Sequence, residues 1–139
     1  MNSNLRGIVA GLIATVVLSV LMYLKGMMGL MPELNVIAML AGKMGSSMAM
    51  GWVAHFVIGA FVYGLAFANL GGKLPGNTSV ARGIALGVIG WLIMMLVLMP
   101  MMGAGLFAMQ MGMMAAVATL VLHVIFGAVL GLAYDKLGS

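Results

Sequence analysis

The stretch from Gly51 to Phe67 constrains the fold more than any other part of the chain, because it is apolar and carries no charged residue. With its apolar flanks it reaches about 20 residues, which is enough for one helix to cross a bilayer. The whole chain has the same character: 65% of its 139 residues are hydrophobic and 6% are charged, against roughly 25% in soluble domains. We therefore expect an integral membrane protein with one domain, residues 1–139, and no separate soluble module.

A second copy of this stretch lies near the C-terminus, at His123-Val-Ile-Phe-Gly-Ala-Val-Leu-Gly-Leu-Ala-Tyr134. Both copies read His-x-x-x-Gly-Ala, followed by Gly-Leu-Ala and an aromatic residue. The first copy, which begins at His55, has one residue more between the two parts. Another motif is also duplicated, since Arg6-Gly-Ile-x-x-Gly-x-Ile recurs from Arg82. The sequence thus predicts two tandem repeats, at about residues 5–70 and about residues 81–137.

Four apolar runs are long enough to cross a membrane as helices, at about residues 7–24, 47–69, 82–99 and 114–134. The predicted fold class is all-α, an integral membrane four-helix bundle made of two tandem two-helix repeats. Two crossings per repeat leave both units in the same orientation, so a pseudo-twofold axis along the membrane normal should relate them. This axis would place His55 and His123 at like depth on equivalent helices.

Two short features interrupt this plan. Met31-Pro32-Glu33 should open a short interfacial helix that ends near Gly42, since proline is tolerated at a first helical position and glycine often follows a last one. Pro100 should kink or end the third membrane helix. Basic residues predict the orientation: Arg6, Lys73, Arg82 and Lys136 would share one side, so the positive-inside rule places both termini in the cytoplasm.

Glycines at helical spacing predict where the helices pack closely. Small residues let helix backbones approach each other where lipid supplies no hydrophobic drive. The expected packing residues fall into pairs along the helices and beside the histidines: Gly7, Gly11, Gly59, Gly83, Gly87, Gly127 and Gly131. Each histidine therefore belongs to a glycine-lined helix face that a neighbouring helix or a flat ligand can approach.

His55 and His123 are the only histidines, and both fall within apolar spans. One interpretation is structural, with each imidazole hydrogen-bonded to a neighbouring helix through Thr119, Tyr63 or a carbonyl group, or to the other histidine. A second is bis-histidine ligation of haem b, in which the two residues bind the cofactor from opposite faces. A third is a site for a metal or a transported ion, because ionisable residues inside a membrane often mark such pathways.

Charge and motif content narrow the function further. The only acids, Glu33 and Asp135, lie outside the predicted spans, so a carboxylate proton relay or acid–base pair has no residues to form it. The six Lys and Arg residues form no clustered stripe for nucleic acid. No phosphate-binding glycine loop or nucleophile elbow occurs. We therefore expect no enzymatic activity and no nucleic-acid partner.

Methionine is unusually frequent, with 18 residues, most of them in and around the two connections at one end of the predicted bundle. Thioethers are soft ligands that suit Cu(I). Methionine is also a flexible side chain that fills irregular apolar gaps. Because these residues follow no repeated ligand spacing, the sequence favours gap filling and predicts no metal site.

The Arg-Gly-Ile helix starts and the His-x-x-x-Gly-Ala segments resemble those of small, uncharacterised bacterial inner-membrane proteins with four helices, grouped as a domain of unknown function. The resemblance covers essentially the whole chain and implies a bacterial source. The predicted function is that of an accessory or structural subunit of a larger membrane complex, which contacts lipids and other integral membrane subunits in a homo- or hetero-oligomer. A haem b electron-transfer protein and a small copper or ion conduit are the alternatives.

Overall fold

The computed structural model describes residues 1–27, 36–43, 45, 47–101, 105–106 and 113–138. Four of its helices are long and apolar enough to cross a membrane: Ser3–Lys25, Met48–Lys73, Ser79–Met101 and Ala116–Leu137, which we call the first to fourth spans. No strand occurs among the described residues. The predicted fold class, an all-α protein with four membrane-spanning helices, is thereby confirmed.

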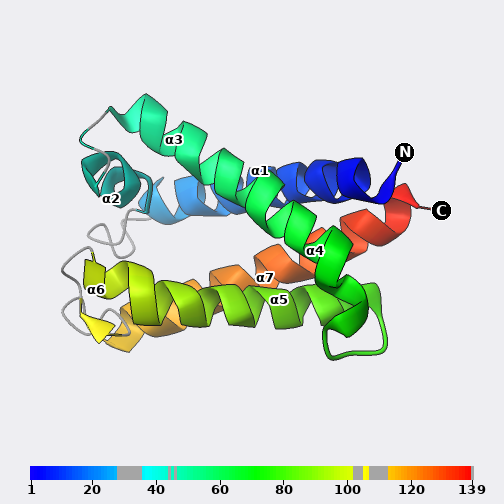
Figure 1. Ribbon diagram of the computed structural model, residues 1–139. Helices are drawn as coiled ribbons and strands as arrows, with labels where there is room; N and C mark the ends of the chain where they lie inside the picture. Colours follow the sequence, from blue (N-terminus) through cyan, green and yellow to red (C-terminus); the bar gives the residue numbers. More distant parts are fainter. Residues whose placement is uncertain (28–35, 44, 46, 102–104, 107–112, 139) are drawn as a thin grey trace.

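The spans contain helices of different types. The first lies in α1, Ser3–Met27, and the fourth lies in α7, Met113–Leu137. The second consists of α3, Met48–Val57, a π-helical segment, Ile58–Tyr63, α4, Gly64–Leu70, and a 3-10 turn, Gly71–Lys73. The third consists of α5, Ser79–Ile93, a π-helical segment, Met94–Leu98, and α6, Met99–Met101. Both termini lie at one end of the bundle, the terminal end, whereas α6 and the short helix α2, Val36–Lys43, lie at the other (Figure 1).

Two helices begin at hydroxyl side chains. The side chain of Ser47 accepts a hydrogen bond from the backbone N–H of Met50 at 3.4 Å. Thr78 caps α5 in the same way, by accepting from the N–H of Ala81 at 3.1 Å. Such caps satisfy N–H groups that have no partner within the helix. The cap at Thr78 explains why the third span begins earlier than the predicted start at Arg82.

The third span is described as far as Met101, one residue past Pro100. A proline ring in a helix clashes with the carbonyl group four residues earlier and donates no hydrogen bond. Here a wide π-helical turn precedes the proline, and the Met99 N–H donates to the carbonyl of Met94, five residues back. The short helix α2 also continues past Gly42, to Lys43. Its predicted start, and most of the predicted turn at residues 101–113, lie outside the described residues.

The other π-helical segment coincides with the extra residue of the first sequence copy. A π turn absorbs one added residue within an otherwise regular α-helix. In the segment Ile58–Tyr63 it keeps Gly59 and Gly64 both against α1. An ideal Cβ at Gly7 would overlap the carbonyl oxygen of Gly64, and one at Gly11 would lie 2.5 Å from that of Gly59. The first two spans therefore touch through backbone.

The third and fourth spans pack in the same manner. An ideal Cβ at Gly83 would overlap the carbonyl oxygen of Gly127, and one at Gly127 would overlap that of Gly83. A Cβ at Gly87 would meet the carbonyl oxygen of His123, and one at Gly131 would meet that of Ser79. These glycines let α5 and α7 approach until their backbones are in contact, one turn after another.

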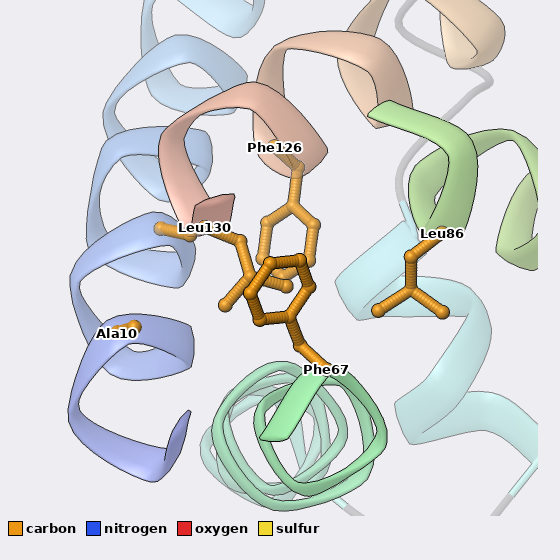
Figure 2. Close-up of a cluster of buried hydrophobic side chains, with 6 residues drawn as sticks. Ala10, Phe67, Leu86, Phe126 and Leu130 are labelled. Carbon is orange, nitrogen blue, oxygen red and sulfur yellow. The ribbon is translucent and has the colours of Figure 1, made fainter. Parts of the chain in front are cut away.

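Aromatic and aliphatic side chains join the two helix pairs near the terminal end. The buried core contains Ala10, Phe67, Leu86, Phe126 and Leu130, and Figure 2 shows the rings of Phe67 and Phe126 close together at its centre. Phe67 meets Tyr134 edge to face, with 5.0 Å between ring centroids. Arg6 closes this end, because its Nε donates to the Tyr134 carbonyl at 2.6 Å and its guanidinium lies 3.9 Å from the centre of the Tyr134 ring. The terminal end of the bundle is thus filled.

Candidate functional site

A cavity lies between the spans and receives side chains from all four of them. Its lining consists of Thr15, Leu18, Met22 and Lys25 from α1, His55, Ile58, Gly59 and Tyr63 from the second span, Met94 and Leu98 from the third, and Thr119, Leu122, His123 and Phe126 from α7. The structure thus brings both sequence-predicted histidines to one site. Most of the surrounding wall is apolar.

His55 projects from α3 and is 9% exposed. Its Nε2 atom is buried and has no hydrogen-bond partner in the described part of the chain. The rings of Trp52 and Phe56 lie edge-on to the imidazole, each with a centroid distance of 5.9 Å. Neither ring forms a hydrogen bond with Nε2, so the buried nitrogen reduces the stability of the fold.

His123 has a defined hydrogen-bonding state. Its Nδ1 atom lies 2.8 Å from the backbone carbonyl oxygen of Thr119, one turn earlier in α7. A carbonyl oxygen can only accept, so Nδ1 carries the hydrogen and donates it. In the neutral imidazole, Nε2 then has a free lone pair that can accept a hydrogen bond or bind a metal. The partner is a carbonyl of the same helix, not of a neighbouring helix as the structural interpretation expected.

A family of unknown function, DUF6789, matches residues 1–139, which is the whole chain. The protein belongs to this family. No curated protein and no solved structure matches the chain significantly. The expected resemblance to an uncharacterised family is confirmed.

Three side chains at or beside the DUF6789 cavity have roles that the sequence analysis did not predict. Lys25, in the last turn of α1, lines the cavity. Tyr63 packs edge to face on Phe126, with 5.1 Å between ring centroids, and an ideal Cβ at Gly90 would overlap its hydroxyl group. Trp91 supports the α7 wall, because its Nε1 donates to the Thr119 hydroxyl and the Ala116 carbonyl, each at 3.1 Å.

The size of the cavity separates the ligands that the sequence left open. Its volume is about 140 Å³, and an engineered protein cavity of about 150 Å³ holds benzene. A porphyrin is several times larger than one ring, so haem b would require the packed spans to separate. A metal ion would instead need ligand atoms drawn to within about 2.0–2.3 Å of it. The described residues contain no cluster of three or more His, Cys, Asp or Glu side chains that could hold a metal ion.

Proposed function

We propose that this protein binds a small molecule inside the membrane, in the cavity that His55 and His123 share. The observation that carries the proposal is the buried Nε2 atom of His55, which has no hydrogen-bond partner in the described part of the chain. An unpartnered buried polar group costs about 1–3 kcal/mol. Such a group is rare in folded proteins and calls for a specific explanation, of which a ligand is one.

The pseudo-twofold axis predicted from the repeats supports a site at the centre of the bundle. Alignment of the two copies makes Leu18 equivalent to Met94, Met22 to Leu98, His55 to His123, and Ile58 to Phe126. All eight of these residues line the cavity. The equivalent aromatic residues Phe67 and Tyr134 contact each other, as residues beside a twofold axis do. We propose that the tandem repeats enclose the cavity about this axis.

Binding is proposed here, without catalysis. No carboxylate occurs among the described residues that line the cavity. The lining contributes imidazoles, hydroxyls and one ammonium group among apolar side chains. A mostly apolar cavity with a few converging polar groups is the usual form of a small-molecule site. The site therefore has the composition of a receptor, a carrier or a storage site for a membrane-soluble molecule.

An accessory subunit of a larger membrane complex is the second candidate. Its support is a shallow apolar groove on the outer surface of the first two spans, lined by Leu12, Trp52, Val53, Phe56, Val57 and Phe61. Phe61 and Val53 are about half exposed there, at 48% and 51%. A helix of another integral subunit, from a second copy or a different protein, would fit such a groove, as would a lipid chain. Both candidates can hold for one protein.

Native mass spectrometry after extraction in mild detergent tests both candidates. We expect the protein to carry a small bound molecule, and expect Leu122→Trp to abolish it by filling the cavity. Val121→Trp is the matched control, because Val121 is the adjacent residue and is 51% exposed. Loss of the molecule in both variants, or in neither, would contradict the cavity assignment. Co-extraction of larger integral subunits would support the accessory role, and a bare monomer in every mild detergent would count against it.

The proposed location is a bacterial inner membrane, with both termini in the cytoplasm. Arg6, the loop with Lys73, and Lys136 lie at the terminal end, while α2 lies at the opposite end (Figure 1). Single cysteines at Asn77 and at Gly42 can be probed with an impermeant thiol reagent, because the chain has no native cysteine. Asn77 suits the substitution better than the neighbouring Gly76 of the same loop, because the φ of 127° at Gly76 disfavours any side chain. In intact cells we expect labelling at Gly42 only, and the reverse pattern would invert the topology.

A further inference from the structure

We infer that the cavity binds the ring of a hydroxylated aromatic molecule, a phenol or a quinol, whose hydroxyl group donates a hydrogen bond to a histidine Nε2 atom. This inference rests on the proposed binding function and specifies the ligand class. It follows from two properties of the cavity: its volume and the hydrogen-bonding state of its imidazoles.

The volume of the cavity matches a ligand with a single aromatic ring. A cavity of about 140 Å³ approaches the volume of about 150 Å³ that holds a single benzene ring in an engineered protein. Phe126 and Ile58 form part of the wall, and the ring of Tyr63 lies edge-on to that of Phe126. Aromatic pairs favour such offset or edge-to-face arrangements, so a third ring can pack on this wall.

The two imidazoles favour a ligand that donates a hydrogen bond. His123 donates through Nδ1 to Thr119, which leaves its Nε2 as an acceptor in the neutral form. The Nε2 atom of His55 is buried with no partner among the described residues. An aromatic hydroxyl is a strong donor attached directly to an apolar ring. It would satisfy a histidine nitrogen without bringing a charge into the membrane.

The test measures retention of small rings by the immobilised protein in lipid nanodiscs, with the amount held by empty nanodiscs subtracted. The probes are 4-butylphenol, butylbenzene and a decyl-substituted quinol. We expect the phenol to bind about tenfold more tightly than butylbenzene, the size of effect that one buried hydrogen bond produces. His55→Leu should remove most of this difference, because a phenol has one hydroxyl hydrogen and the unpartnered Nε2 of His55 is the expected acceptor. His123→Leu should remove less of it. Leu122→Trp should abolish binding of all three probes, and Val121→Trp should abolish none.

The outcomes distinguish this inference from the broader proposal. Equal binding of phenol and butylbenzene, with both lost in Leu122→Trp, would overturn the hydroxyl assignment and retain a small-molecule cavity. Binding of Cu(I), lost in both histidine variants and without any phenol binding, would replace the inference with a metal site. If the phenol binds and the decyl quinol does not, a free phenolic compound is the ligand class. If the quinol binds at least as tightly, the membrane quinol pool is its source.

Discussion

Alanine at Gly83 or at Gly127 should destabilise the protein by about 1–3 kcal/mol, the range measured when a packed interior receives extra methyl or methylene groups. At each of these glycines an ideal Cβ would overlap the carbonyl oxygen of the other residue. Backbone atoms cannot rotate away as a side chain can, so the added methyl group must push α5 and α7 apart. Leucine at either position should cost more, because the helices would have to separate further.

Unfolding in mixed micelles, followed by circular dichroism, measures this effect. Gly42→Ala is the matched control: Gly42 is a helical glycine, and an added Cβ there would meet no atom of the described residues within 4 Å. Because alanine favours helices over glycine by about 1 kcal/mol, the control should be neutral or stabilising. The double variant with alanine at Gly83 and Gly127 should cost less than the sum of the single costs, since the first substitution already separates the backbones. Additive costs would show that the two glycines do not share one contact.

The same contact explains which part of the fold was predictable. Gly83 and Gly87 are four residues apart, and helical geometry places them on one face whatever surrounds the helix. Hydropathy also locates the membrane spans, because a helix needs about 20 apolar residues to cross a bilayer. The π-helical turn at Ile58–Tyr63 was also within reach, because the two sequence copies differ there by one residue. The π-helical turn before Pro100 was not, since it depends on hydrogen bonds that rearrange next to the proline.

The site was predictable to a smaller extent. The duplicated motif led us to place His55 and His123 at related positions, and both do line one cavity. Neither the volume of that cavity nor the contribution of Lys25 follows from periodicity, because both depend on how closely the spans approach at each level. The difference between the two imidazoles was equally hidden. The same motif surrounds both, yet among the described residues a carbonyl acceptor is found for the His123 ring and none for Nε2 of His55.

That difference leads to opposite expectations for the same substitution at equivalent positions. His55→Leu should stabilise the protein by about 1–3 kcal/mol, because it removes a buried polar atom that has no partner. His123→Leu should instead cost about 0.5–1.5 kcal/mol, the net value of the hydrogen bond that its Nδ1 donates to Thr119. The measurement is unfolding in mixed micelles with no added ligand, and each variant serves as the control for the other.

The opposite stability changes expected for these two variants test whether His55 serves ligand binding or folding. A residue kept for the fold should weaken the protein when it is replaced, whereas a residue kept for a ligand can weaken binding and strengthen the empty fold. We expect His55→Leu to combine higher stability with loss of the preference for phenol over butylbenzene. If His55→Leu destabilises the protein as His123→Leu does, the His55 imidazole has a partner in the folded state, and a ligand is no longer needed to explain why it is buried.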